Sequence, residues 1–216
     1  MAERDRDLER RLRALGGAGR AAVGDAGAGV GLAGGLASGL ASRAAREGLL
    51  DVAYGFADSP WGPLLVAVTP RGLVRVAFPG EVGTTLAWLA REVSPRVLAA
   101  PVAIDGVRRE LDAYFAGRLR RFATPVDLRT VPGFSRRVLE AAAAVPYGAT
   151  AGYAEVAARA GSPRAARAAG NALAANPVPI VVPCHRILPA AGGLGGYAGG
   201  AERKRALLAL EGAIPD

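Results

Sequence analysis

Short apolar runs separated by turn residues fill the chain from Gly48 to Gly80. The runs are Asp51–Ala57, Leu64–Thr69 and Leu73–Phe78, and the connections between them read Ser-Pro-Trp-Gly-Pro and Pro-Arg-Gly. Proline and glycine in such short connections are typical of tight turns between antiparallel strands. The pattern therefore predicts three antiparallel strands.

Two helical patterns follow these strands. Residues Glu81–Val93 and Val102–Ala116 carry apolar side chains at helical spacing. The inward positions expected of the first helix are Leu86, Leu89 and Ala90. A further apolar run, Phe122–Leu128, is consistent with one more strand. These strands and helices predict an α+β domain over residues 48–131. Because the domain contains no histidine, no cysteine and no paired carboxylates in an apolar setting, we expect it to have a structural role.

Helical patterns dominate residues 132–216. The first helix is expected over Phe134–Val145, and Pro146-Tyr147-Gly148 ends it. A short helix over Tyr153–Ala160 follows. The sequence therefore predicts a second, mainly helical domain after the α+β domain.

The next helix begins, by its sequence signals, just after Gly161. Ser162 fits an N-cap and Pro163 fits the first helical position, and the helix is expected to run to about Ala174. Two short helices joined by a tight glycine-containing turn form a helix-turn-helix. We predict this motif here.

The second helix of this motif combines small and basic residues. Ala166 and Gly170 would let its backbone approach a nucleic-acid groove, and Arg164 and Arg167 supply positive charge. The alternative is an alanine-rich helix that only packs tightly in a small core. With the arginines and the overall charge included, the pattern favours contact with DNA.

Residues 1–47 differ in composition from the rest of the chain. The run Ala26–Ser42 is uncharged and places glycine at every fourth residue, at Gly27, Gly31, Gly35 and Gly39. That spacing resembles a membrane-helix packing face, but the run is short and weakly hydrophobic. We therefore expect a low-complexity tail, disordered or loosely helical, rather than a membrane span. Asp25 and the acidic leader argue against a signal peptide.

The charge of the chain indicates a polyanionic partner. The 216 residues carry a formal net charge of +8, with a pI of about 10.7. Such a balance favours nucleic acid. Lys204 is the only lysine, so a compositional bias toward arginine is the alternative, and the charge alone does not establish nucleic-acid binding.

One cysteine and one histidine limit the chemistry that the chain can perform. A single cysteine excludes an intramolecular disulfide, which fits a reducing cytoplasm. The same count excludes a zinc site built from several such ligands. We expect no metal and no small-molecule cofactor.

These two residues are neighbours, in the stretch Asn176–Arg186. Pro177, Pro179 and Pro183 stiffen the backbone that leads to Cys184 and His185. Adjacent side chains do not face each other on a helix, so a direct contact between thiol and imidazole is not expected. A water relay, with a carboxylate orienting His185, is the more reasonable geometry.

Several roles are open to Cys184 at this point. A lone cysteine is by default a small buried hydrophobe. A cysteine hydrolase normally separates its cysteine and histidine in sequence, and a redox sensor needs a resolving cysteine that this chain lacks. Stoichiometric alkyl transfer onto sulfur needs only one activated thiolate.

The stretch Asn176–Arg186 resembles the active-site signature of the methylated-DNA–protein-cysteine methyltransferases, or O6-alkylguanine-DNA alkyltransferases. The resemblance covers about residues 48–212. Its other segments are Ser59–Leu65, Pro146–Tyr153, Gly161–Arg167, Gly195–Gly200 and Lys204–Gly212. It implies a ribonuclease-H-like N-terminal domain and a monomeric protein that repairs double-stranded DNA carrying O6-alkylguanine.

The resemblance also implies residue roles. Cys184 would accept the alkyl group, His185 would relay its proton through water, Glu211 would orient His185, and Asn176 would brace the loop. The helix-turn-helix would bind in the minor groove, where Arg164, Ala166 and Gly170 would contact DNA. Arg167 would enter the duplex and take the place of the flipped guanine. Tyr153 would help rotate the nucleotide. The guanine pocket would be lined by Tyr197, Gly195, Gly199, Val182 and Pro183.

The chain departs from the family pattern at a few positions. Gly152 stands where a serine usually caps the helix at Tyr153, and Ala198 replaces a common serine in the pocket loop. The N-terminal domain lacks the ligands for the zinc that some relatives carry. The cysteine-rich module of the transcription-regulating relatives is absent too. The acceptor Cys184 separates this chain from alkyltransferase-like proteins, which bind lesions without transfer.

Overall fold

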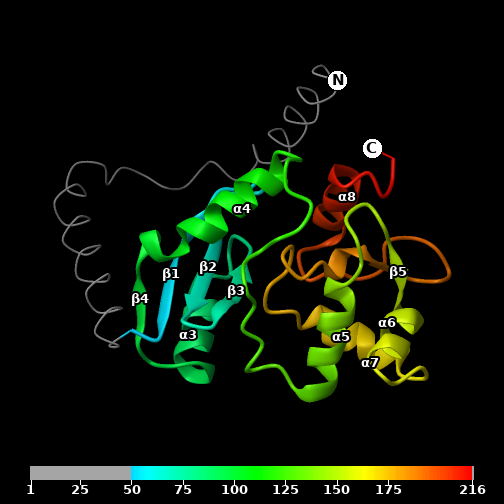
Figure 1. The fold of residues 1–216 in the computed structure, drawn as a ribbon, viewed down its shortest axis with the longest axis horizontal. Coiled ribbons are helices and arrows are strands. Elements are labelled where there is room, and N and C mark those ends of the chain that lie inside the picture. Colours follow the sequence, from blue (N-terminus) through cyan, green and yellow to red (C-terminus); the bar gives the residue numbers. More distant parts are fainter. Residues whose placement is uncertain (1–49, 216) are drawn as a thin grey trace. The chain divides into compact units, whose positions relative to one another are not determined.

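The computed structural model describes residues 50–215. They form two compact units, with the division between Phe115 and Ala116 (Figure 1). The domain limits expected from the sequence, 48–131 and 132–216, stay a prediction. No helix within residues 50–215 is both long and apolar enough to cross a membrane, and the glycine-spaced run at 26–42 lies outside the described residues.

The first unit is built on a sheet whose strand order is β3-β2-β1-β4. The three antiparallel strands expected from the sequence are β1 (Val52–Ala57), β2 (Leu64–Thr69) and β3 (Gly72–Ala77). A fourth strand, β4 (Val97–Ala99), pairs parallel with β1 and was not predicted. Its three residues are too few to show an alternating pattern.

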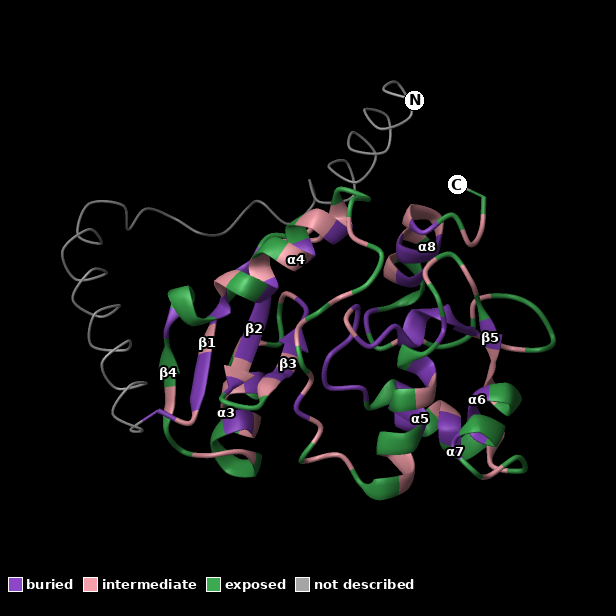
Figure 2. Cartoon of the chain, in the orientation of Figure 1, coloured by how far each residue is buried: buried purple, intermediate pink, exposed green. Residues whose placement is uncertain are grey.

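The helices of this unit are α3 (Val82–Glu92) and α4 (Asp105–Phe115), with a 3₁₀ turn, η2 (Pro101–Ile104), leading into α4. Leu89 of α3 packs into a core with side chains of β1, β2 and β3, which Figure 2 shows as buried strands. Leu86 was expected to face inward, and it is partly buried against this core. The expectation for Ala90 was wrong, because it is exposed and Thr85 is buried instead.

The second unit is mainly helical. Its helices are α5 (Gly133–Ala143), α6 (Tyr153–Arg159), α7 (Ala166–Ala174) and α8 (Ala201–Leu210). The short strands β5 (Ala151–Gly152) and β6 (Ile187–Leu188) pair in parallel, and a 3₁₀ turn, η3 (Cys184–Arg186), precedes β6. The strand expected over Phe122–Leu128 was wrong, since that segment is irregular.

Helices α6 and α7 pack against each other and are joined by a tight turn, as a helix-turn-helix requires. Gly152 is the N-cap of α6. The N-cap expected at Ser162 was wrong: α7 begins at Ala166, and a separate turn, closed by the Ala165 N–H donating to Ser162 O at 2.9 Å, precedes it. Pro163 and Arg164 lie in that turn. The serine and proline that suggested a helix start thus belong to a separate turn before the helix.

Candidate active site

The loop from Asn176 to Pro183 connects α7 to the 3₁₀ turn that carries Cys184. It contains a backbone conformation that is rare for its residue type: Ile180 has φ of 75°. A β-branched residue in the left-handed region is strained and persists only where surrounding contacts hold it. The Val182 N–H donates to Val178 O at 3.0 Å, which closes a turn around Ile180.

Asn176 holds this loop together and contacts the thiol. Its Nδ2 donates to Val182 O at 2.9 Å and to Cys184 Sγ at 3.1 Å, and its Oδ1 accepts from the Val178 N–H at 3.0 Å. Asn176 is buried. These hydrogen bonds are compatible with the bracing role that the resemblance implies, and one of them goes directly to the sulfur.

His185 is fully buried and is oriented by Glu211. Its Nε2 lies 3.0 Å from Glu211 Oε1, and neither side chain is exposed. A carboxylate accepts hydrogen bonds, so Nε2 carries the proton and Nδ1 is left as an acceptor. Nδ1 is buried and has no hydrogen-bond partner among residues 50–215. Since no hydrogen bond joins the described Cys184 and His185 side chains, a water molecule between them would satisfy Nδ1.

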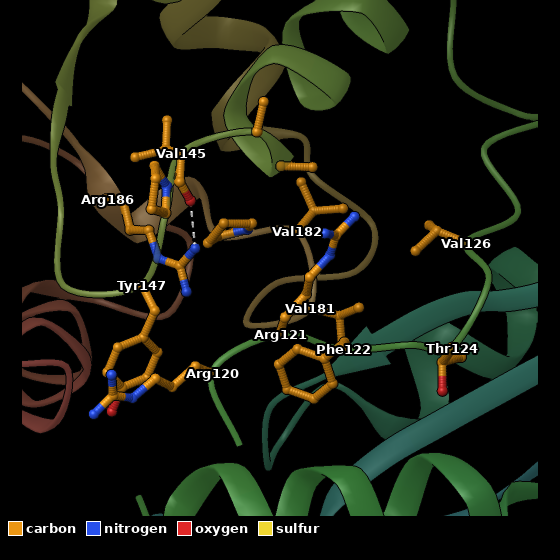
Figure 3. A pocket seen from close by; sticks show the side chains of 14 residues that line it. Arg120, Arg121, Phe122, Thr124, Val126, Val145, Tyr147, Val181, Val182 and Arg186 are labelled. Atoms are coloured by element: carbon orange, nitrogen blue, oxygen red, sulfur yellow. Dashed lines mark hydrogen bonds between the residues drawn. The ribbon is translucent and has the colours of Figure 1, made fainter. Parts of the chain in front are cut away.

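Arg186 completes the network and was not predicted from the sequence. Its Nε donates to Glu211 Oε2 at 2.8 Å and its Nη2 to Glu211 Oε1 at 2.9 Å, while Nη1 donates to Val145 O at 2.6 Å (Figure 3). Glu211 is therefore held by two basic side chains that are adjacent in the chain. The only sequence signal for Arg186 was its position beside His185.

Burial sets the protonation of the reactive pair. It raises the pKa of the Cys184 thiol, an effect that the hydrogen bond from Asn176 and the charge of Lys204 oppose. Burial lowers the pKa of His185, opposed by Glu211. The resting site thus holds a neutral thiol and a neutral imidazole, so a thiolate forms only if a base such as His185 removes the proton.

Lys204 supports the same site from α8 and was also missed as a site residue. Its Nζ donates to Ile187 O at 2.7 Å and lies 3.4 Å from Gly196 O, and its side chain is buried. Burial lowers the pKa of its ammonium group. The lysine joins α8, β6 and the glycine-rich loop beside Cys184.

A pocket of about 350 Å³ opens at the cysteine. Its volume is in the range of small-ligand sites. The residues around it include Tyr153, Gly170, Leu173, Cys184, Tyr197 and Ala198. A Cβ at Gly170 would lie 3.6 Å from the Tyr153 ring, so the close approach of α6 and α7 brings Tyr153 to the pocket.

The predicted pocket residues fall into two groups. Tyr197 lines the pocket, and Gly195 lies beside it, where a Cβ would be 3.3 Å from the Tyr153 hydroxyl; Gly199 is buried in the same loop. The structure does not place Val182 and Pro183 in the lining of this pocket, and they line a different one. Residues 181–183 line that other pocket and Cys184 lines this one, a division that the sequence alone did not reveal.

The residues predicted to contact DNA lie on or before α7. Arg167 is exposed in the first turn of α7, and Ala166 is its first residue. Arg164 is exposed in the preceding turn, and Gly170 lines the cysteine pocket.

Comparisons with known proteins agree with this geometry. Residues 133–213 match the family "6-O-methylguanine DNA methyltransferase, DNA binding domain", and residues 52–128 match "6-O-methylguanine DNA methyltransferase, ribonuclease-like domain". The methylated-DNA–protein-cysteine methyltransferase of Mycobacterium tuberculosis (strain ATCC 25618 / H37Rv) is 43% identical over 163 residues, which cover 74% of this chain and 92% of the relative. The chain belongs to the methylated-DNA–protein-cysteine methyltransferase family.

Further relatives extend this result. The methylated-DNA–protein-cysteine methyltransferase of Methanosarcina acetivorans is 38% identical over 165 residues, covering 74% of this chain and 97% of the relative. A crystal structure of Mycobacterium tuberculosis OGT in complex with DNA superposes with a TM-score of 0.65 at 41% identity, covering 74% of this chain and 93% of that one. The family assignment, the fold class and the methyltransferase class expected from the sequence are confirmed.

Proposed function

We propose that this methyltransferase repairs duplex DNA by moving the alkyl group of O6-alkylguanine, and also that of O4-alkylthymine, irreversibly onto Cys184. The observation that supports this most directly is a single cysteine at a pocket, hydrogen-bonded by Asn176 and followed by a His185–Glu211 pair. A site that reacts once needs no second base or group to regenerate the thiol.

The geometry of the site supports the following transfer step. Neutral His185 accepts the thiol proton at Nδ1 through a water molecule, and Glu211 stabilises the imidazolium that forms. Cys184 Sγ then bonds to the alkyl carbon while the carbon–O6 bond breaks. The electron pair of the broken bond stays on O6 of the guanine. The departing base takes up a proton. The product is a thioether, which does not return to a thiol without a further reaction.

Base flipping is required because the O6 substituent lies within the stacked duplex. The family's DNA-binding domain spans α6 and α7, and the crystallised relative holds DNA. We assign α6 and α7 to the minor groove as a helix-turn-helix, with exposed Arg167 filling the space that the guanine leaves. Tyr153 lies against Gly170 of α7, and both line the pocket, a position suited to guiding the nucleotide.

The central test is a mass measurement on the full chain. A duplex with one O6-methylguanine should add one methyl group to the peptide that contains Cys184, and Cys184→Ala should add none. An unmodified peptide at saturating lesion would refute the transfer. Repeated turnover of an ester substrate would instead indicate a hydrolase.

The flipping role of Arg167 has its own test. Arg167→Ala should slow repair of the duplex by much more than it slows reaction with free O6-benzylguanine. Arg118→Ala, which removes an equal charge from an exposed position elsewhere, serves as the control. Equal losses on both substrates would contradict the role. Monomeric state and cytoplasmic location stay predictions.

A further inference from the structure

A second pocket lies against residues 176–186, here called the reactive loop, and the transfer reaction makes no use of it. Its volume is about 720 Å³, and it shares no lining residue with the pocket at Cys184. Its walls come from the segment before α5, the end of α5 with the turn after it, and the reactive loop itself (Figure 3). Residues 181–186 therefore separate two pockets.

The charge of this pocket selects an anion. Arg120, Arg121 and Arg186 line it, and none of its described lining residues carries a carboxylate. Glu211 neutralises Arg186, whereas Arg121 has no hydrogen bond or ion pair with the described residues. Arg120 lies 5.8 Å from the Tyr147 ring centroid and is exposed. Two guanidinium groups thus remain available to an anionic group.

The end of α5 at this pocket would by itself disfavour an anion, because the carbonyl groups of a helix C-terminus carry partial negative charge. Arg186 removes much of this effect, since its Nη1 donates to Val145 O at 2.6 Å. The buried guanidinium is also held by Glu211, so it is a fixed part of the wall.

The rest of the lining is apolar and aromatic. Phe122 and Tyr147 supply rings, and Val126, Val181 and Val182 supply branched side chains. Figure 3 shows the Arg121 side chain extending from its segment toward Val182. An inorganic anion would leave these apolar groups uncovered. A planar base joined to a phosphate matches both the arginines and the apolar wall of the pocket. Aromatic rings and arginines together recognise nucleotides in this way.

We propose that this pocket binds a nucleotide, with its phosphate between Arg120 and Arg121 and its base against the apolar wall. The nucleotide is either a free nucleoside monophosphate or an unpaired nucleotide of a DNA strand. The inference goes beyond alkyl transfer and does not depend on it, because binding is measured without any reaction at Cys184.

The test measures binding of thymidine monophosphate to the full chain by calorimetry. Arg120→Ala and Arg121→Ala should each weaken it by up to about fivefold, the loss expected for one contact between charges at a solvent-exposed site. Arg118→Ala is the matched control, because it is exposed in the same segment but does not line the pocket. Equal affinities in Arg121→Ala and Arg118→Ala, or no binding to the unmodified chain, would overturn the proposal.

Two further measurements locate the ligand and identify its source. Methyl resonances of Val181 and Val182 should shift on binding; shifts confined to Leu173, in the cysteine pocket, would overturn the proposal. Inorganic phosphate that binds as tightly as thymidine monophosphate would overturn it too. A short oligothymidylate that binds more tightly, with the same dependence on Arg121, indicates a strand; equal affinities indicate the free nucleotide.

Discussion

The pair formed by Glu211 and Arg186 gives the sharpest prediction. Both side chains are almost wholly buried, at 0% and 7% exposure, and the carboxylate accepts two hydrogen bonds from Arg186 and lies 3.0 Å from His185 Nε2. Glu211→Gln keeps the shape and removes the charge, which leaves the buried guanidinium uncompensated. Removing one partner of a buried pair costs about 3–5 kcal/mol.

That loss is a large share of the stability of a typical domain, about 5–15 kcal/mol. It corresponds to a fall in Tm of at least about 12 °C for a unit of this size. Urea unfolding followed by circular dichroism measures it. Glu155→Gln is the control, because its pair with Arg159 is 2.6 Å long but about half exposed, and such pairs contribute about 0–1 kcal/mol.

A double-mutant cycle separates the pair from other effects. Arg186→Met should also destabilise the fold, and the double variant should cost at least about 2 kcal/mol less than the sum of the single changes, because no unpaired buried charge remains. On the folded fraction, Glu211→Gln should slow methyl transfer by on the order of a hundredfold, since His185 loses the partner that orients it. A Glu211→Gln protein as stable as Glu155→Gln would refute the reasoning.

Three other predictions follow from the site and its supporting turns. The lowered pKa of His185 means that the unfolded chain takes up a proton near pH 6.5 that the folded chain does not, so the free energy of unfolding should fall below that pH, and His185→Gln should flatten this slope. Asn176→Ala should move the pH midpoint for reaction of Cys184 with iodoacetamide upward, because the thiolate loses a hydrogen bond; a downward shift would contradict this. Gly148→Ala should destabilise by about 1–3 kcal/mol, since φ is 77° and the new Cβ would lie 3.0 Å from a main-chain carbonyl oxygen, whereas Gly106→Ala, in an open helical position, should stabilise by about 0.5 kcal/mol; equal effects in thermal melts would refute the difference.

Sequence patterns predicted those parts of the fold that short-range order determines. The three antiparallel strands are short apolar runs separated by turns that contain proline and glycine, and α5 ends shortly before Pro146-Tyr147-Gly148. The predictions from these patterns were wrong where one local pattern fits two structures, and incomplete where a strand is too short to show a pattern. Ser162 and Pro163 suit a helix start and a tight turn equally well, and β4 is too short to carry a pattern.

The sequence by itself determined the reactive chemistry: one thiol, one imidazole beside it, and a proline-rich approach that holds them. The family resemblance implied Asn176 and Glu211 as partners of that pair, and only the tertiary structure decided the rest of its surroundings. It brings Glu211 from the end of α8 to both His185 and Arg186, and it directs Val182 away from the cysteine pocket. The physical reason is that Arg186 pairs with a carboxylate 25 residues away in the chain, and no local pattern records which distant group a buried charge will meet.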